Sequence, residues 1–108
     1  MKLLVTVVQD QDVQKLLERL TEEGFSATKL ASTGGFLKVG NTTVIVGVDD
    51  DKVEDVLTFT RETCEKRDQY SPTPVSPFGR SGILSRPQKV AVGGATVFIL
   101  DVERFERI

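Results

Sequence analysis

One pattern occurs twice in this chain, and it limits the possible folds more than any other feature of the sequence. A β-branched strand, a group of acidic residues and an amphipathic helix follow one another at 5–17 (VTVVQDQDVQKLL) and again at 44–57 (VIVGVDDDKVEDVL). A further strand-like segment follows each unit, so the chain consists of two successive βαβ units. Two such units predict an α+β, ferredoxin-like βαββαβ domain with an antiparallel sheet and both helices on one face.

The first unit shows why its segments are assigned to a strand and a helix. The segment 3–8 is aliphatic or β-branched on both alternating faces, which predicts a central strand covered on each side. Asp10 and Asp12 are candidate N-caps for the helix, and Gly24 is placed to end it. Apolar residues follow the i, i+3, i+4, i+7 spacing of a buried helical face at Val13, Leu16, Leu17 and Leu20. The second helix has a similar face formed by Val53, Val56, Leu57 and Cys64.

Glycine and proline divide the rest of the chain. The segments 25–33 and 36–48 are predicted to be two strands joined by a turn at 34–35. The segment 66–88 contains all four prolines and several serines, so we expect a long, flexible loop there. Residues 89–102 (KVAVGGATVFILDV) are predicted to form one long strand, interrupted at 93–94 by a bulge or a close backbone approach. All 108 residues are assigned to a single domain.

The composition narrows the functional classes. The chain has no histidine and one cysteine, so neither a transition-metal site nor an intramolecular disulfide is expected. The net charge of −2 gives no indication of general nucleic-acid binding. No apolar run approaches the roughly 18 residues of a membrane span, and the N-terminus lacks the features of a signal peptide. The simplest interpretation is a cytoplasmic protein without a metal or another cofactor.

Two long windows contain no acidic residue. Between positions 24 and 48 the only charged residues are Lys29 and Lys38, and between 69 and 100 they are Arg80, Arg86 and Lys89. Strands and turns hold fewer glutamates than helices do, which is one explanation. The other is that both windows face an anionic ligand, which makes the segment 27–48 a candidate ligand-holding hairpin.

Catalytic chemistry has little support in the sequence. There is no histidine base, Cys64 is predicted on a core-facing side of its helix, and no serine lies in a nucleophile-elbow motif. Acylphosphatase-like enzymes share the predicted fold, but the residues after the first strand, 9–12 (QDQD), are acidic and contain no arginine. The acidic run 49–51 is favoured as a helix cap over a cation site. We therefore expect a binding protein rather than an enzyme.

Three segments carry a resemblance to a known family: ATKLASTGGFLKVGNTT at 27–43, VGGATVFILDV at 92–102 and VQDQD at 8–12. In these segments the sequence closely resembles the PII-like cyclic di-AMP receptor proteins of Gram-positive bacteria. The resemblance implies a homotrimer with three ligand sites at the clefts between protomers. It also implies a non-enzymatic signal transducer that binds cyclic di-AMP and rearranges flexible loops to alter contact with a protein target.

The resemblance further implies which residues contact the ligand: Ala27, Thr28, Gly35, Phe36, Leu37, Asn41 and Gly47. An amide such as Asn41 suits the donor and acceptor edge of adenine, while Phe36 and Leu37 can cover the base. Thr28 and backbone N–H groups near Gly35 can donate to phosphates. Gly47 would leave space for the base.

The sequence departs from the family at two positions beside this stretch. Where the family usually carries Asn and Arg, this chain has Gly24 and Ser26, so an expected cation is missing. Lys29, Arg104 and Arg107 are candidates to compensate across a subunit boundary. The departure leaves a second hypothesis open, a PII-like trimer that binds another adenine nucleotide, or none, and acts through protein contact.

Overall fold

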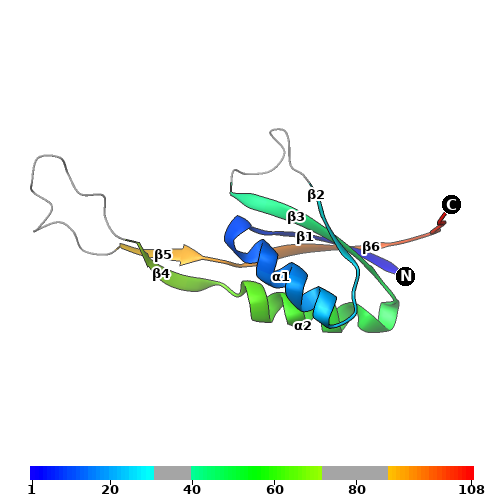
Figure 1. The fold of residues 1–108 in the computed structure, drawn as a ribbon, viewed down its shortest axis with the longest axis horizontal. Coiled ribbons are helices and arrows are strands. Elements are labelled where there is room, and N and C mark those ends of the chain that lie inside the picture. The colour runs from blue at the N-terminus through cyan, green and yellow to red at the C-terminus, as the bar shows by residue number, and fades with distance from the viewer. Residues whose placement is uncertain (31–39, 72–87) are drawn as a thin grey trace, which may run out of the picture.

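The computed structural model of the chain describes residues 1–30, 40–71 and 88–108. Figure 1 shows how the helices and strands follow one another. In chain order they are β1 (Lys2–Gln9), α1 (Asp10–Glu22), β2 (Ala27–Leu30), β3 (Asn41–Val48), the short 3-10 helix η1 (Asp50–Lys52), α2 (Val53–Cys64), β4 (Arg67–Ser71), β5 (Gln88–Val92) and β6 (Ala95–Asp101).

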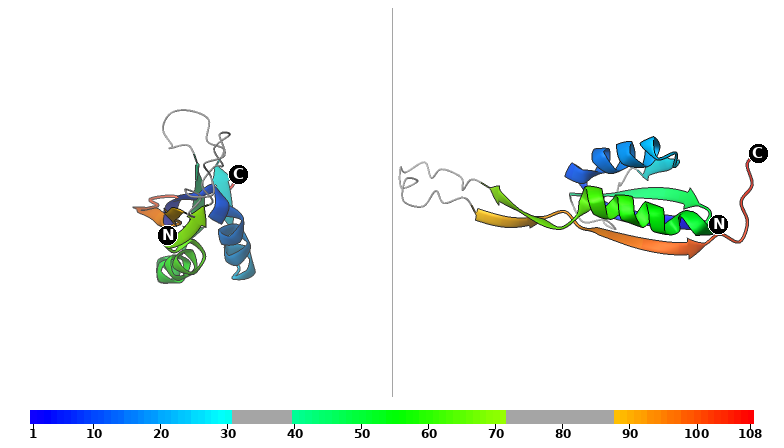
Figure 2. Two further views of the ribbon diagram at one scale, coloured as in Figure 1. Left: turned by 90° about the vertical axis from the view of Figure 1, so that its left-hand side faces the viewer. Right: turned by 90° about the horizontal axis from the view of Figure 1, so that it is seen from below.

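Four of the strands form one antiparallel sheet in the order β2-β3-β1-β6. The first strand is central, because β1 pairs with β3 along one edge and with β6 along the other. Both helices lie on the same side of this sheet (Figure 2) and pack against each other. The prediction of a small α+β domain with an antiparallel sheet and two helices is confirmed, and the arrangement is compatible with the ferredoxin-like fold.

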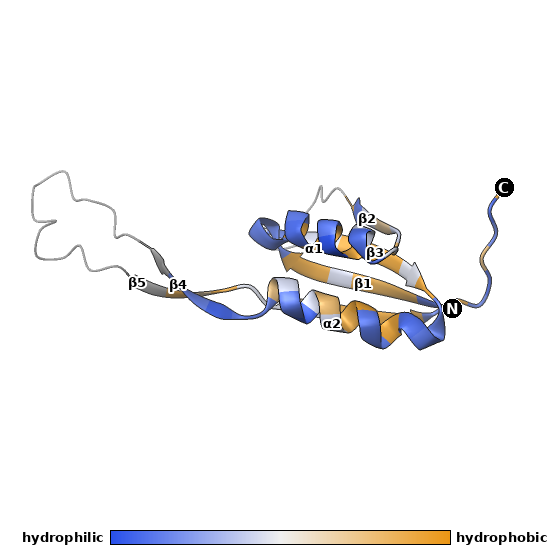
Figure 3. Ribbon diagram, turned by 60° about the horizontal axis from the view of Figure 1, so that its bottom comes forward, coloured by the Kyte–Doolittle hydropathy of each residue, from blue (hydrophilic) through white to orange (hydrophobic). Residues whose placement is uncertain are grey.

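The core lies between the sheet and the two helices. The apolar stripes predicted for the helices are confirmed, because they supply buried residues to this core or pack at its margin. Figure 3 shows the same division, with a hydrophobic β1 and a largely hydrophilic outer side of α1. Full burial of one leucine side chain typically contributes about 1.5–3 kcal/mol to folding. The buried apolar residues are Leu4, Val8, Val13, Leu16, Leu20, Val44, Val46, Val48, Val56 and Cys64.

The other face of the sheet has no helix over it among the described residues; we call it the open face. Leu3, Val5 and Val7 belong to this face because they alternate with the buried positions of β1. In the β1–β6 register Leu100 lies opposite Leu3, and Phe98 lies opposite Val5. The side chains of Leu100 and Phe98 are 49% and 56% exposed. The expected cover on each side of β1 is therefore not provided by the residues that the structure describes.

The start of α1 also differs from the prediction. The helix begins at Asp10 with Gln9 at the N-cap position, and no side chain forms a capping hydrogen bond. Asp12, a predicted cap, is instead buried and accepts hydrogen bonds from Arg67 at 2.7 and 3.4 Å. The predicted end of α1 is confirmed, because Gly24 has a φ of +87°, a conformation that favours glycine.

Two strands form a separate antiparallel ribbon, β4–β5, which extends away from the four-stranded sheet (Figure 1). The expected loop at 66–88 therefore begins with β4 and ends at the start of β5, and positions 72–87 lie outside the described residues. The long strand predicted at 89–102 is wrong. It is two strands in different sheets, and the chain changes direction between them at Gly93 and Gly94, both with a φ of +86°.

Candidate functional site

The strand register sorts the predicted ligand residues onto the two faces of the sheet. Thr28 of β2 lies opposite Ile45 of β3. Within β3, Asn41, Ile45 and Gly47 are separated from one another by even numbers of residues. Thr28, Asn41 and Gly47 therefore share the open face. Ala27 belongs to the opposite face, which the helices cover, and packs at the margin of the core. The sheet therefore separates it from the other three residues. The remaining predicted ligand residues, Gly35, Phe36 and Leu37, lie outside the described residues.

Asn41 lines a cavity of about 360 Å³ at the start of β3, which we call the Asn41 cavity. Its side-chain amide makes no hydrogen bond to any residue that the structure describes. An amide carries both donors and an acceptor, which is the pattern needed to pair with the edge of an adenine. The polar and glycine residues around this cavity are Gln9, Asn41, Lys66, Gly93, Gly94 and Thr96.

Close backbone contacts shape one wall of the Asn41 cavity. The N–H of Gly93 donates to Oε1 of Gln9 at 2.7 Å, and the N–H of Gly94 donates to the carbonyl oxygen of Cys64 at 2.5 Å. A Cβ on Gly93 would lie 2.4 Å from the carbonyl oxygen of Glu65, closer than real Cβ contacts. Glycine at this position therefore lets the β5–β6 junction approach the end of α2 closely.

Gly47 lines a second cavity of about 550 Å³ near the other end of β3, which we call the Gly47 cavity. Gly24 and Ser26 line the same cavity, so the two positions that depart from the family pattern meet a predicted ligand residue. A Cβ on Gly47 would meet only the Cε atom of Met1, at an ordinary 3.8 Å. Packing within the described chain therefore does not require glycine here. The charged residues around the cavity are Glu23, Asp49, Lys52 and Asp55.

The two cavities are far apart within one chain. Asn41 and Gly47 begin and nearly end the same eight-residue strand. At about 3.4 Å per residue, their backbones are separated by about 20 Å. A ligand bound to both residues of one chain would have to span that distance.

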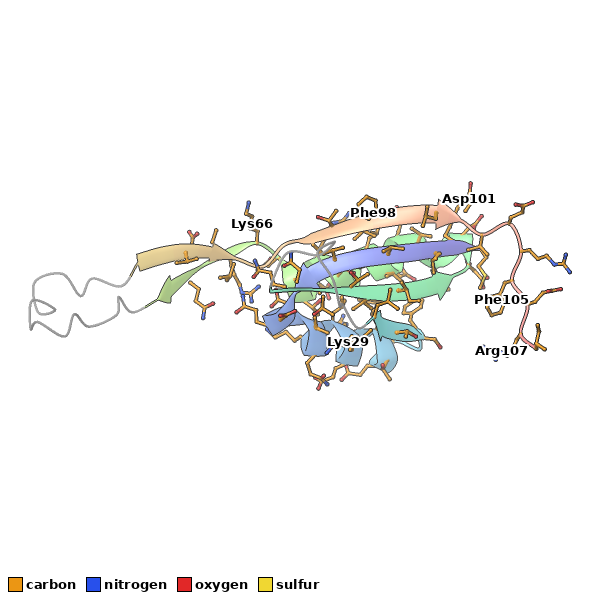
Figure 4. All side chains as sticks on the ribbon, turned by 90° about the horizontal axis from the view of Figure 1, so that it is seen from above. Lys29, Lys66, Phe98, Asp101, Phe105 and Arg107 are labelled. Carbon is orange, nitrogen blue, oxygen red and sulfur yellow. The ribbon has the colours of Figure 1, made fainter. Side chains whose placement is uncertain are left out.

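The structure does not bring the three proposed compensating cations to the Asn41 cavity. Lys29 belongs to the face of β2 that the helices cover, whereas Thr28 belongs to the open face. Arg104 forms an ion pair with Glu106 in the C-terminal segment. Figure 4 shows Arg107 beyond one end of the domain and Lys66 at the other, where the ribbon begins. The cations that line the two cavities are Lys66 and Lys52, and sequence reasoning named neither.

Cys64 is a cysteine that the structure buries at the end of α2. Burial raises the pKa of the Cys64 thiol. A hydrogen bond with Thr63 acts in the opposite direction and offsets part of this increase in pKa. The thiol is 1% exposed, so it is poorly placed to act as a nucleophile. Within 1–30, 40–71 and 88–108, no three His, Cys, Asp or Glu side chains group to hold a metal ion. No helix in these ranges is long and apolar enough to cross a membrane.

The fold and the site together define a small α+β domain with an open sheet face and a cavity near each end of β3. The chain belongs to the cyclic-di-AMP receptor family, whose family model matches residues 1–108. The resemblance found in the sequence is thereby confirmed. The chain is also similar to a solved structure described as a functionally unknown protein from Pediococcus pentosaceus ATCC 25745. The two are 37% identical with a TM-score of 0.76, over 99% of this chain and 96% of that one.

Proposed function

We propose that this protein is a cytoplasmic, non-enzymatic PII-like signal transducer of ferredoxin-like fold that binds cyclic di-AMP between the subunits of a homotrimer. Ligand binding would change loop conformation and thereby regulate a protein target. The observation that carries the proposal is the amide of Asn41, which has no partner among the described residues and lines a cavity of a chain in the cyclic-di-AMP receptor family. The free amide supports base recognition, because a side chain already paired within the protein could not read an adenine edge.

The open face supports assembly with further copies of the chain. It presents Phe98 and Leu100 half exposed beside the aliphatic side chains of β1. Apolar surface of this kind is commonly covered in an assembly, because burial contributes about 25 cal/mol per Å². A ring of identical subunits can cover the same face on every copy.

The distance between the two cavities supports a ligand site shared by two chains. Asn41 and Gly47 of one chain are about 20 Å apart along β3. Neighbouring subunits can bring the Asn41 cavity of one chain close to the Gly47 cavity of the next. The same residues could then contact one cyclic dinucleotide without spanning a whole strand.

Calorimetric titration with cyclic di-AMP tests this function. We expect saturable binding with one ligand per subunit, because a trimer has three equivalent clefts between subunits. Absence of heat at high micromolar ligand, with the protein folded and trimeric, would rule out the proposal.

A second candidate function is a PII-like trimer that binds another adenine nucleotide, or none, and acts as a protein-interaction module. The Gly47 cavity favours the form of this alternative that binds no nucleotide, because its described lining contains three carboxylates and one lysine, together with Gly24 and Ser26 in place of an amide and a cation. Thermal-shift measurements with cyclic di-AMP, ATP, ADP and AMP distinguish the two. A larger shift with a mononucleotide than with cyclic di-AMP would favour the alternative.

A further inference from the structure

The described residues that line the Asn41 cavity include one lysine and no carboxylate. Lys66 lines the cavity and makes no ion pair with any residue that the structure describes. Asp10 lies beside the cavity, but its carboxylate accepts a hydrogen bond from the Thr42 hydroxyl. An anionic group in the cavity would therefore be attracted by Lys66, the charged residue among those described that lines it.

The Gly47 cavity has the opposite balance. Among the described residues that line it, Lys52 is the one lysine or arginine, against the three carboxylates of Glu23, Asp49 and Asp55. The N-terminal ammonium of Met1 lies close by, but the carboxylate of Asp50 holds it at 2.8 Å. Of the two cavities, the one at Asn41 is the more favourable for a phosphate.

The amide of Gln9 adds a second donor to the Asn41 cavity. Its Oε1 atom accepts hydrogen bonds from the Gly93 N–H at 2.7 Å and from Nε2 of Gln11 at 3.0 Å. Because the backbone N–H can only donate, the oxygen of the Gln9 amide must face Gly93. The NH₂ group of Gln9 makes no hydrogen bond to a described residue, and it remains available to donate.

Contacts on both sides of Lys66 hold its backbone at the edge of the cavity. Two residues earlier, the carbonyl oxygen of Cys64 accepts the 2.5 Å hydrogen bond from Gly94. One residue later, Arg67 is fixed by the buried carboxylate of Asp12. The lysine side chain therefore extends from an anchored point of the chain (Figure 4). Anchoring of this kind reduces the conformational freedom lost when a ligand binds.

We propose that Lys66 binds a phosphate of the nucleotide, with the Gln9 amide as a second donor and the Asn41 amide on the adenine. The inference rests on the proposed function and assigns a cation to its site. In this assignment Lys66 supplies the charge for which Lys29, Arg104 and Arg107 were the sequence-based candidates. The cavity volume of about 360 Å³ is near the lower end of the range for small-molecule sites, as suits one nucleotide half of a larger ligand.

The test compares Lys66→Met with Lys66→Arg in calorimetric titrations with cyclic di-AMP at low and high salt. Lys66→Met keeps an unbranched chain but removes the charge, and we expect its affinity to fall about tenfold or more at low salt. The difference between the two salt concentrations should also shrink, because the lost attraction was the part that salt screens. Lys66→Arg should retain most of the affinity. Lys15→Met is the matched control, since Lys15 is an exposed lysine on α1 and loses the same charge elsewhere.

The experiment separates this inference from the proposed function. If wild-type protein binds cyclic di-AMP and Lys66→Met binds equally well at low salt, the assignment of Lys66 is wrong and the receptor function stands. If wild-type protein does not bind cyclic di-AMP, the titrations are repeated with ATP and with inorganic pyrophosphate. Lys66-dependent binding of either probe would support the phosphate site although the cyclic di-AMP function had failed. No Lys66-dependent binding to any of the three probes would overturn the inference.

Discussion

The guanidinium of Arg67 lies 2.7 Å from the carboxylate of Asp12 and joins the base of the β4–β5 ribbon to the first turn of α1. Asp12 is 1% exposed, and Arg67 also donates to the carbonyl oxygen of Glu65 at 3.0 Å. The hydrogen bond with Asp12 raises the pKa of Arg67. Because a buried carboxylate without a partner is strongly unfavourable, the pair favours one attachment of the ribbon to the domain.

Arg67→Met should destabilise the protein more than Asp12→Asn. The first substitution leaves a buried negative charge without its partner, whereas the second removes that charge and keeps an acceptor oxygen. Urea denaturation of both variants and of the double variant measures the free energies of unfolding. The double variant should be more stable than Arg67→Met alone. An equal loss in both single variants would contradict the role given to the pair.

Gly93→Ala should cost more stability than Gly94→Ala. Both residues have a φ of +86°, so each substitution imposes a similar backbone strain of about 1 kcal/mol. Only at Gly93 would the new Cβ also collide, at 2.4 Å from the carbonyl oxygen of Glu65, while Gly94 has open space. Denaturation curves of the two variants isolate this close approach, because Gly94→Ala is the control. Equal losses would show that the junction does not need the close contact.

Phe98→Asp should shift the protein from trimer to monomer. Phe98 lies on the open face and is 56% exposed in the single chain, so a charge there would have to be buried in the proposed assembly. Sedimentation velocity measures the change in mass. Thr58→Asp, an exposed substitution on α2, is the control and should leave the assembly unchanged. A trimer that survives Phe98→Asp would place the subunit contact elsewhere.

Asn41→Ala should lower the affinity for cyclic di-AMP about tenfold or more without changing the assembly, because the amide is proposed to read the adenine. Gly47→Leu should also weaken binding, since its side chain would project from the open face at the edge of the Gly47 cavity, beside Met1, where the ligand is proposed to lie. Co-expressed trimers that mix the two variants should recover binding at some clefts, where Gly47 of one chain meets Asn41 of the next. Calorimetry on purified mixed trimers measures that recovery. Its complete absence would mean that each site uses both residues of one chain.

The stability of the protein should fall as the pH rises above about 9, partly through Cys64. Burial raises the pKa of its thiol above the ordinary value of 9.0. The unfolded chain releases this proton at lower pH than the folded chain does, so unfolding is favoured as the pH increases. Urea denaturation at about pH 8 and about pH 10 measures the loss. Cys64→Ala should lose less stability over this interval, and an identical loss in both proteins would contradict the prediction.

The parts of the fold that sequence reasoning predicted correctly depend on local patterns. The helical stripe from Val13 to Leu20 and the glycine that ends α1 are visible within one segment, because side-chain spacing and backbone freedom are local properties. The β4–β5 ribbon is different, since it pairs Arg67 with Val92 across 25 positions. Neither the sequence of β4 nor that of β5 indicates which segment it pairs with. The four prolines nearby favoured an uninterrupted loop instead.

The same distinction applies to the candidate site. Alternation along β3 is enough to place Asn41 and Gly47 on one face, because side chains in a strand point to opposite faces in turn. The position of Lys66 depends on three segments that meet near Gly93, so no local pattern could indicate it. The sequence-based candidates for a cation lie in β2 (Lys29) and in the C-terminal segment (Arg104 and Arg107), and their role across a subunit boundary stays a prediction. Within one chain, the structure brings a lysine from the connection between α2 and β4 to the Asn41 cavity.

The open face of the sheet has a consequence for how the protein is made. A newly folded chain leaves Phe98 and Leu100 about half exposed, and in the proposed assembly another copy would cover them. In the proposed trimer, folding and assembly are therefore coupled, and the apparent stability of each chain rises with its concentration. At low expression a cell would hold a less stable, more easily degraded monomer. The amount of protein, as well as the amount of ligand, would then set how much receptor is ready to respond.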